Sequence, residues 1–483
     1  MSQAGVTLDW PQNGTRFAQK EAVLRWTATE LPQGSVIALY IDGINMHNST
    51  ALSGEHKPGA LAIGSHKAAV VVSSGGHVPR ESDAAGNTFF LDLAPHKASW
   101  GPAAPLGSNL EHMDSESAEH VSAIKRLVDQ PPPYPTDKFE GRGIVMCAGG
   151  RDLFANAYVA VKALRHHGCT LPIEVFFQGP DEVNAEAVEA MSELDVVCVD
   201  TQWFPEVQNV YLRGWQMKAV ALFHSSFEEI LMMDADNLPA SDPTYLFNTE
   251  EFLATGNLYW HDFSTDPHWI KPEFMALFGL TMQAGEYELE AGQVVLDKRR
   301  CWLSLLVYQY MNTHFQYFYR RMYGDKDTHR LAFKITGQPI SVSKRHPESI
   351  GRFVASSVGP RFCGDTMLHL DAKGMPLFLH RTLSDFEALP QGAHKWRRAH
   401  SKPPLTWQNA TKSFVGWDVR TIPTRAGGGG WIEEWCVQTA MDTQFRPVPR
   451  RLVELERLTV DWMQELAAHD WLQDLPADAK GRG

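Results

Sequence analysis

From residue 141 onwards, short apolar runs alternate with longer stretches in which apolar residues recur every three or four positions. The apolar runs, such as GIVMC and IEVFF, predict buried strands, and the amphipathic stretches predict helices. The predicted strands span 143–148, 171–179, 195–200 and 228–234, and the predicted helices span 154–167, 181–194 and 211–226. Because such alternation builds a mostly parallel sheet between helices, the predicted fold class is α/β.

The first 98 residues follow a different pattern. Short runs rich in β-branched and aromatic residues, such as VTLDW, VIALYIDG and NTFFLDL, are separated by Gly, Asn, Pro and Ser. This spacing predicts an immunoglobulin-like β-sandwich over residues 1–98. Exposed aromatic residues there, such as Trp10, Trp26 or Tyr40, would suit carbohydrate binding, although aromatic residues of sandwiches more often face the core.

Two segments flank the α/β region, which we place at residues 141–425. Pro, Gly, Ser and acidic residues accumulate over 99–140, which closes on QPPPYPTDKFEG and predicts a Pro-rich linker with one short helix near AEHVSAIKRLVDQ. Residues 426–483 include LVELERLTVDWMQELAAHDWL, whose helical spacing of apolar residues predicts a C-terminal helical extension.

The charge balance narrows the class of partner. The 483 residues include 44 Lys and Arg against 57 Asp and Glu, and the net charge is −13. We expect no nucleic-acid partner, since phosphate backbones attract basic surfaces. None of the six cysteines stands in a CxxC pair, which argues against a structural zinc site. No apolar run reaches the ~18 residues of a membrane-spanning helix, so we expect no membrane segment.

The candidate chemistry lies where the fourth predicted strand ends. Asp234 and Asp236 follow the apolar run at 230–233 and are separated by one residue. Side chains at i and i+2 of an extended chain project to the same side, so both carboxylates can bind one hard divalent cation. Such a cation neutralises the charge on a departing diphosphate. A bare D-x-D more often marks a solvated turn, but the buried strand before it favours a metal site.

Longer segments around this motif resemble a known family. Four segments are similar, in their order along the chain, to the fungal-type Golgi α-1,2/α-1,3-mannosyltransferases that extend mannan branches: GIVMCAGGRDLFANAYVAVKALRHHGCTLPIEVFFQG, GWQMKAVALFHSSFEEILMMDADNLPASDPTYLFNTEEFLATGNLYWHDF, ELEAGQVVLDK and GDKDTHRLAF. The resemblance covers about residues 141–385. It implies a GT-A fold, a GDP-mannose donor, a glycan acceptor, Mn²⁺ and retention of the anomeric configuration.

The resemblance also implies a third metal ligand, because a histidine near the end of such a domain usually joins the two aspartates. His380, in MPLFLHRTL, follows a strand-like run and is the candidate, with His394, in GAHKW, as the alternative. The metal ligands expected are therefore Asp234, Asp236 and His380.

Donor-binding candidates come from five places in the chain. Lys218 is expected to face the nucleotide-sugar, since a lysine suits phosphate as a compact charge, although a solvated helix lysine is the alternative. The loop at 148–151 joins a strand end to a helix N-terminus, which favours an anion, and Arg151 or Asp152 would hold base or ribose. The full set is Ala148, Gly149, Gly150, Arg151, Lys218, Asp234, Gly292, Gln293 and Lys395.

The catalytic candidates are Glu290, Asp325, Lys326 and Asp327. Glu290 begins a Glu-Ala-Gly-Gln element that lines the donor sugar and the acceptor in related retaining transferases. Asp325 and Asp327 would grip sugar hydroxyls, and the structural alternative is a charged helix start, where Asp is a good N-cap.

The acceptor side is expected to be shaped by Trp260, His261 and Asp262, although core packing explains Trp260 almost as well.

Mechanism and function each leave alternatives open. Retention proceeds either by double displacement through a carboxylate such as Glu290 or Asp325, or by attack on the face that the diphosphate leaves, and the lack of an evident nucleophile favours the second. A UDP-sugar donor and a non-catalytic carbohydrate-binding protein are the alternative functions. A glycoside hydrolase is disfavoured, because a D-x-D does not place carboxyls across a sugar ring. The family implies the Golgi lumen, although no signal or anchor is visible in this sequence.

Overall fold

The computed structural model describes side chains and backbone for residues 105–107, 113–204, 207, 214–263, 270–281, 288–351, 362–364, 366–381 and 448–476, and elsewhere only the strands named below. The chain forms two compact units. Unit 1 comprises Met1–Ser99, Thr411–Val415 and Thr439–Thr443, and unit 2 comprises the remainder.

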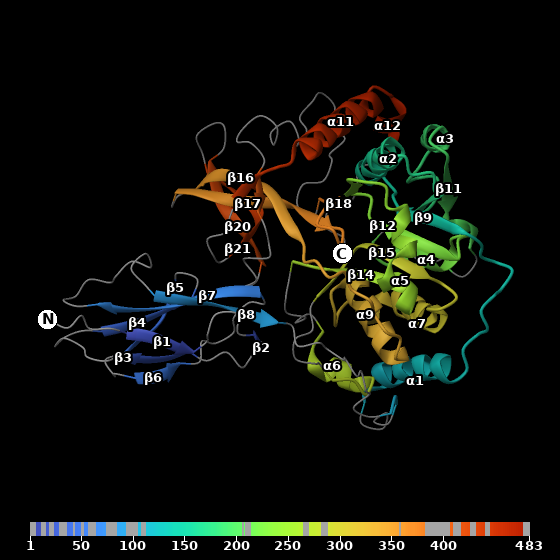
Figure 1. Ribbon diagram of the computed structural model, residues 1–483. Coiled ribbons are helices and arrows are strands. Elements are labelled where there is room, and N and C mark those ends of the chain that lie inside the picture. Colours follow the sequence, from blue (N-terminus) through green and yellow to red (C-terminus); the bar gives the residue numbers. More distant parts are fainter. Residues whose placement is uncertain are drawn as a thin grey trace. The chain divides into compact units, whose positions relative to one another are not determined.

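Unit 1 contains two β-sheets, which lie in the blue part of the chain in Figure 1. The first has the strand order β1 (Val6–Trp10), β3 (Leu24–Ala28) and β6 (Ser53–His56), and the second has the order β2 (Arg16–Ala18), β8 (Ala85–Asp92), β7 (Gly64–Ser73), β4 (Val36–Ile41) and β5 (Ile44–Ser49). The immunoglobulin-like type stays a prediction, and the side chains of Trp10, Trp26 and Tyr40 lie outside the described residues.

Unit 2 is built on a six-stranded sheet. Its strand order is β11 (Val196–Asp200), β10 (Ile173–Phe177), β9 (Arg142–Cys147), β12 (Glu229–Met233), β15 (Leu289–Asp297) and β14 (Asn257–His261). The first four strands are parallel to one another, whereas β15 runs antiparallel to both β12 and β14. The sheet is therefore mostly parallel, which confirms the predicted α/β class.

Helices cover both faces of this sheet (Figure 1). Met146 and Leu231 pack in the layer of α2 (Arg151–His166), α3 (Ala185–Ser192) and α11 (Arg450–Ala467). Val145 and Met232 pack in the layer of α1 (Ser115–Asp129), α4 (Met217–His224), α7 (Trp302–Thr313) and α9 (Gly324–Thr336). Because successive residues of a strand point to opposite faces, strands buried on both faces have continuous apolar sequences.

A second sheet of unit 2 continues from the D-x-D motif. Its eight strands have the order β13 (Asn237–Pro239), β18 (Pro376–His380), β17 (Gly359–Leu370), β21 (Trp431–Thr439), β20 (Trp417–Arg425), β16 (Glu348–Ser356), β19 (Thr406–Gln408) and β22 (Phe445–Pro447). The antiparallel register of β13 and β18 sets Asn237 opposite His380, so strand pairing brings this histidine to the aspartates.

The C-terminal part differs from the prediction of a helical extension over 426–483. Residues 431–439 form β21, which pairs with β17 through Val437 and Gly364, and the helices begin only at α11 and continue in α12 (Trp471–Asp474). The run WIEEWCVQT is rich in aromatic and β-branched residues, which favour a strand once a partner strand is available.

The segment 99–140, predicted as a linker, also contributes to unit 2. Helix α1 buries Val121 and Ile124 in the layer that contains α7, so its apolar face belongs to the core. The short elements that complete the unit are η3 (Thr201–Trp203), η4 (Thr244–Asn248), α5 (Glu250–Thr255), α6 (Pro272–Leu277) and α8 (Phe315–Phe318). Among the described residues, no helix combines the length and the apolar character needed to cross a membrane.

Candidate active site

The two aspartates lie in the turn between β12 and β13. The Asp234 backbone N–H donates to the Gly292 carbonyl at 2.8 Å, and the Asn237 backbone N–H donates to the Asp234 carbonyl at 3.1 Å. The buried Asn237 amide donates to the Gly292 carbonyl at 2.8 Å and to the Gln293 side chain at 2.5 Å. These bonds fasten the turn to β15, so the positions of both carboxylates are set by strands on either side.

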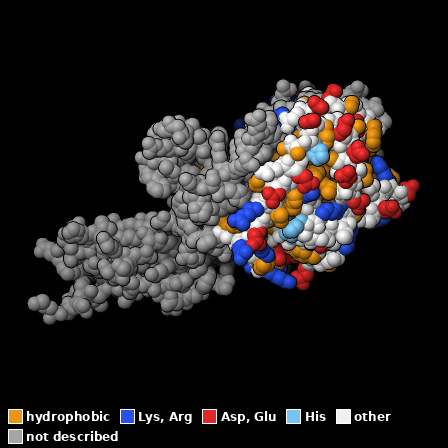
Figure 2. Space-filling model, turned by 90° about the horizontal axis from the view of Figure 1, so that it is seen from above, with side chains coloured by type: hydrophobic (Ala, Val, Ile, Leu, Met, Phe, Trp, Pro, Cys, Tyr) orange, Lys and Arg blue, Asp and Glu red, His pale blue; other side chains and the backbone are white. Residues whose placement is uncertain are grey.

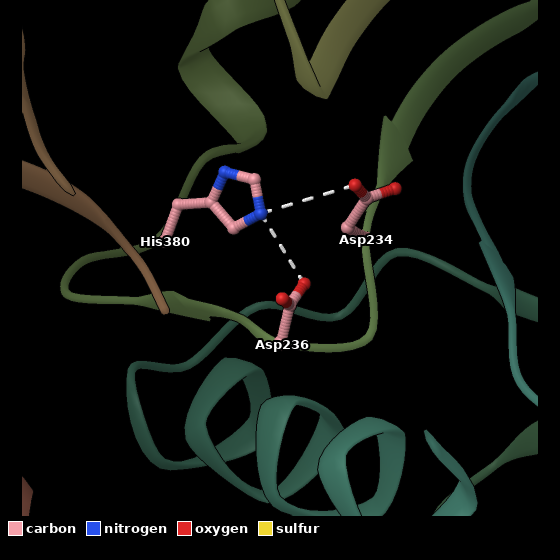
Figure 3. Close-up of side chains that lie close together, drawn as sticks. All are labelled: Asp234, Asp236 and His380. Carbon is pink, nitrogen blue, oxygen red and sulfur yellow. Dashed lines mark ion pairs between the residues drawn. The ribbon is translucent and has the colours of Figure 1, made fainter. Parts of the chain in front are cut away.

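His380, the last residue of β18, points at this turn (Figure 3). Its Nε2 atom lies 3.3 Å from Oδ1 of Asp236 and 3.9 Å from Oδ2 of Asp234. One ligand atom from each of the three residues lies within 4.8 Å of the others. Two carboxylate oxygens and one imidazole nitrogen suit a borderline-hard divalent cation such as Mn²⁺. Asp234, Asp236 and His380 are therefore suitable ligands for the divalent cation that the D-x-D motif predicted.

Glu290 lies behind His380. Its Oε1 atom is 3.1 Å from Nδ1 of His380 and accepts the Gly292 backbone N–H at 2.6 Å. Burial opposes both charges, yet the carboxylates of Asp236 and Glu290 raise the pKa of His380 well above its usual value, and His380 in turn lowers the pKa of Glu290. A side-chain carbon at position 292 would overlap the His380 ring. Glycine at this position thus lets the histidine and the glutamate pack together.

Lys218 joins the aspartate turn to helix α9. Its Nζ atom lies 2.7 Å from Oδ1 of Asp234 and 3.2 Å from Oδ2 of Asp325, and it donates to the Ala291 carbonyl at 3.3 Å. Although burial alone would lower it, the pKa of Lys218 is raised well above its ordinary value by Asp234 and Asp325. The lysine is consequently a fixed positive charge within the site and not a solvated helix residue.

The protonation of Asp234 depends on what binds beside it. Burial raises the pKa of Asp234 to about 6, Lys218 opposes that shift, and Asp236 adds to it. A divalent cation at the cluster would favour the ionised carboxylate by its own charge. Cation binding and proton loss at this cluster are therefore coupled.

The first turn of α9 carries the other predicted acids, and they point to different partners. Asp325 faces Lys218, whereas Asp327 accepts the Tyr323 backbone N–H at 2.7 Å and an Arg330 hydrogen bond at 3.0 Å. The structure thus brings Asp325 to the site, while Asp327 secures the start of the helix.

Lys326 lies on the side of the site where an acceptor was expected. It donates to Asp262 at 2.8 Å, and its Nζ atom is 3.6 Å from Oε2 of Glu288. Glu288 is fully buried, and burial raises its pKa to about 7 against the opposing charges of Arg330 and Lys326. Lys326 and Asp262 therefore form one buried charge network with Glu288 and Arg330.

The loop after β9 is bonded differently from the prediction of an anion-binding helix start. The Gly150 backbone N–H donates to the Glu182 carbonyl at 3.1 Å, and the Arg151 N–H donates to the Pro476 carbonyl at 2.8 Å. A side-chain carbon on Gly149 would overlap the Glu182 carboxylate. Arg151 pairs with its neighbour Asp152 at 3.4 Å. A donor role for Ala148, Gly149, Gly150 and Arg151 stays a prediction.

The remaining candidates are Trp260, His261, Lys395 and His394. Trp260 is 2 % exposed and packs edge-on against Phe378 at 5.8 Å, which makes it a core residue. His261 stacks on His346 with ring centroids 4.1 Å apart. Lys395 and His394 lie outside the described residues.

Sequence reasoning missed two contributors, Asn237 and Glu288. Asn237 directly follows the D-x-D, and Glu288 lies two residues before Glu290. The period of a strand could have placed Glu288 on the same face as Glu290.

A mostly parallel α/β sheet with a D-x-D and a histidine gathered at its strand ends is the GT-A-type arrangement that the family resemblance implied. The family model Mannosyl_trans3, which describes mannosyltransferases, matches residues 141–288 and 280–371. This part of the chain thus matches a mannosyltransferase family model, in agreement with the resemblance stated above. His380 lies nine residues beyond the matched range.

Two proteins of similar sequence are likewise named mannosyltransferases. The chain is 26% identical over 314 residues to alpha-1,2-mannosyltransferase MNN21 of Candida albicans, covering 54% of this chain and 47% of the relative. It is 33% identical over 149 residues to alpha-1,2-mannosyltransferase MNN2 of Saccharomyces cerevisiae, covering 30% of this chain and 24% of the relative. The chain thus spans about half, or less, of the length of these two relatives.

Solved structures of transferases are also similar to this chain. The galactosyltransferase LgtC, in complex with donor and acceptor sugar analogs, shares 14% identity at a TM-score of 0.28, covering 41% of this chain and 73% of LgtC. Mouse xyloside xylosyltransferase 1 shares 15% identity at a TM-score of 0.30, covering 42% of this chain and 84% of that protein.

Proposed function

We propose that unit 2 is a metal-dependent glycosyltransferase that moves mannose from GDP-mannose to a sugar hydroxyl of a glycan with retention of configuration. The observation that carries this proposal is the cluster of Asp234, Asp236 and His380 at the strand ends of a unit whose sequence matches a mannosyltransferase family. We further propose Mn²⁺ as the cation, since the donor set combines hard oxygens with one imidazole nitrogen.

The charge of the site supports a bound cation. In the described network, seven carboxyl groups face the cations Lys218, Lys326 and Arg330 and the imidazole of His380, whose pKa is raised by its acidic neighbours. The carboxyl groups are those of Asp234, Asp236, Asp262, Glu288, Glu290, Asp325 and Asp327. Uncompensated buried charge is costly, because the protein interior screens it poorly. A divalent cation would offset much of this excess.

The residues around the cluster would divide the work of transfer. A divalent cation held by Asp234, Asp236 and His380 would supply the positive charge that neutralises the leaving diphosphate. Lys218 fixes the Asp234 carboxylate and adds a second positive charge beside the phosphates. Asp325, on the other side of the Lys218 ammonium, is placed to accept hydrogen bonds from donor-sugar hydroxyls.

Retention is proposed to proceed by attack on the face that the diphosphate leaves. Glu290 is an unsuitable nucleophile, because its Oε1 atom is engaged by His380 and by the Gly292 N–H, and Asp325 is paired with Lys218. The acceptor hydroxyl would then lose its proton to an oxygen of the departing phosphate as the new glycosidic bond forms.

The test is a panel of nucleotide-sugars with and without Mn²⁺, measured as nucleotide release in the presence of a mannose oligosaccharide. GDP-mannose is expected to give GDP, and EDTA is expected to abolish its release. Asp234→Ala and Asp236→Ala are each expected to lower kcat by at least a hundredfold, roughly the effect of losing one electrostatic stabiliser.

Asp129→Ala is the matched control, since this carboxylate is half exposed and pairs only with Lys125 at the surface of α1. It should retain wild-type activity. UDP release in place of GDP would replace the proposed donor, and undiminished activity of the Asp234 variant would end the proposal.

The compartment is proposed by family resemblance to be the Golgi lumen. Localisation of the tagged full-length protein in its native cells tests this, and a diffuse cytosolic distribution would contradict it.

A further inference from the structure

Two exposed aromatic side chains lie beside the charged site. Trp215 precedes α4 and is 36 % exposed, and Tyr323 precedes α9 and is 47 % exposed. Their ring centroids are 5.2 Å apart, with an angle of 45° between the ring planes. Large aromatic rings usually gain more by burial, so this adjacent exposed pair is a candidate ligand-binding surface. We call Trp215 and Tyr323 the aromatic platform.

The platform is held in place by its surroundings. Gly324 has φ of +68°, a conformation that side chains rarely adopt, and a side-chain carbon there would overlap the Trp215 ring. The indole also contacts Tyr319, with ring centroids 6.4 Å apart, and the Tyr319 hydroxyl donates to Asn312 at 2.6 Å. Rings fixed in this way lose little conformational entropy when a ligand stacks on them.

Both rings lie within one helical turn of residues already placed in the site. The Trp215 carbonyl accepts the Lys218 backbone N–H at 3.1 Å. On the other side, Asp325 and Lys326 follow Tyr323 by two and three residues, and Lys326 lies 5.6 Å from the Tyr323 ring centroid. The platform is therefore continuous with the residues proposed to surround the transferred sugar.

The neighbouring groups indicate the chemistry of the ligand. Lys326 and Asp262 compensate each other's charge at 2.8 Å, and both groups can hydrogen-bond. Figure 2 shows acidic, basic and hydrophobic side chains interspersed over one face of the described part of the chain. A neutral ligand with an apolar face and hydroxyls around its edge, which is a pyranose, matches an aromatic surface bordered by such a pair.

Resting on the proposed function, we infer that the aromatic platform stacks a pyranose ring of the acceptor glycan and presents its hydroxyl to the donor sugar. The donor's diphosphate is assigned to the cation cluster, and Lys218 lies between Asp234 of that cluster and Asp325. Trp215 and Tyr323 are accordingly acceptor-binding residues and take no part in holding the nucleotide.

The test compares Trp215→Ala, Tyr323→Ala and Trp215→Phe in the full chain. With GDP-mannose and Mn²⁺, each alanine variant should raise KM for α-mannobiose roughly tenfold, which corresponds to the loss of about one aromatic contact. Trp215→Phe should restore most of the affinity. The affinity for GDP with Mn²⁺ should stay within about twofold of the wild type, which also shows that the variants are folded.

Tyr245→Ala is the matched control. Tyr245 is similarly exposed, at 41 %, but it lies in η4 next to Thr244, which contacts Cys169 near the amino end of β10, at the opposite edge of the sheet from the site. It should leave KM for mannobiose unchanged.

Direct binding separates this inference from the proposed function. Saturation-transfer NMR of α-mannobiose with GDP and Mn²⁺ requires no turnover, and its signal should be strong for the wild type and weak for Trp215→Ala. Equal signals, or no signal from the wild type, would overturn the platform. A variant that loses affinity for GDP while mannobiose binding persists would assign the rings to the donor and overturn it equally.

Discussion

At the scale of single residues, His380 shows how one neighbour sets the chemistry of a ligand. A histidine can offer either ring nitrogen to a metal, and the hydrogen bond of the other nitrogen decides which. Here Glu290 lies 3.1 Å from Nδ1, which leaves Nε2 directed at Asp236 and Asp234. We propose that Glu290, which was expected from the family resemblance to contact sugar, is a positioning residue for this histidine.

Glu290→Gln should therefore weaken Mn²⁺ binding by roughly 10–100-fold, the usual effect of losing a partner behind a metal-bound histidine. Mn²⁺ titration followed by electron paramagnetic resonance measures this directly. Glu116→Gln, a half-exposed surface glutamate paired with Arg320, serves as the control. A nucleophilic role would instead leave Mn²⁺ affinity unchanged and remove only turnover.

Lys298 is a second residue whose surroundings change its chemistry, because burial shifts its pKa. It is fully buried, donates to the Ser225 carbonyl at 2.6 Å, and lies 3.7 Å from the Phe139 ring centroid. Burial lowers its pKa to about 6, with Glu174 opposing that shift. An unfolded lysine titrates near ~10.4, so between these values the unfolded chain binds more protons and the free energy of unfolding rises with pH.

Lys298→Met should flatten this rise between pH 7 and 9 and stabilise the protein at pH 7 by about 2 kcal/mol. Removing the deprotonation penalty gains about 4–5 kcal/mol, and losing the hydrogen bond to Ser225 costs about 1–3 kcal/mol. Urea unfolding at pH 7, 8 and 9 checks both. Lys125→Met, at an exposed position of α1, should keep the wild-type slope, and an unchanged slope in the Lys298 variant would refute the argument.

At the scale of elements, helix α11 contacts and stabilises the end of the strand that carries His380. Arg381 follows the histidine, donates its backbone N–H to the Asp236 carbonyl at 3.1 Å, and forms a buried ion pair with Glu456 of α11. The same helix is tied to α2 through Lys162 and Glu465 at 3.2 Å. The C-terminal helix, predicted as an extension outside the family resemblance, is thus part of the framework of the site.

Glu456→Ala should lower the free energy of unfolding by about 3–5 kcal/mol, since breaking a buried ion pair leaves charge poorly compensated. It should also weaken Mn²⁺ binding, because Arg381 links α11 to Asp236. Thermal unfolding with and without Mn²⁺ measures both effects. Glu454 lies two residues before Glu456 and forms an exposed ion pair with Arg450. Glu454→Ala should therefore change stability by less than about 0.5 kcal/mol.

Element prediction succeeded where the signal is periodic and failed where it depends on a partner. The predicted strand at 228–234 and the predicted helix at 154–167 are seen in the structure as β12 and α2, and α2 begins three residues earlier, at Arg151. The segment 431–439 was absorbed into a helical prediction, because its strand identity depends on pairing with β17. Helix α1 likewise gains its core position only through the layer that contains α7.

At the scale of the whole molecule, the described core supports the site without unit 1. The hydrophobic clusters on the two faces of the six-stranded sheet draw on residues between Val121 and Leu475. The described groups of the candidate site all come from unit 2. We propose that residues 1–99 affect which glycans are reached, and not the transfer step.

A chain lacking residues 1–99 should bind GDP and Mn²⁺ with affinities within about threefold of the full chain, because a cooperative core of this kind unfolds as its own unit. Calorimetric titration with GDP and Mn²⁺ measures this. The full chain with Lys67→Ala, a change within unit 1, provides a reference for minor effects of altering that unit. Loss of GDP binding on truncation would show that unit 1 contributes to the site.

The sequence by itself determined the features that depend on neighbours along the chain. The alternation of strands and helices from residue 141, and the pairing of Asp234 with Asp236, follow from apolar periodicity and from the two-residue repeat of an extended strand. Only the tertiary structure decided that His380 meets these aspartates, that Glu290 orients it, and that Lys218 spans Asp234 and Asp325. Those contacts depend on which strands pair and in which register, and long-range pairing is selected by burial of the whole core and not by any local pattern.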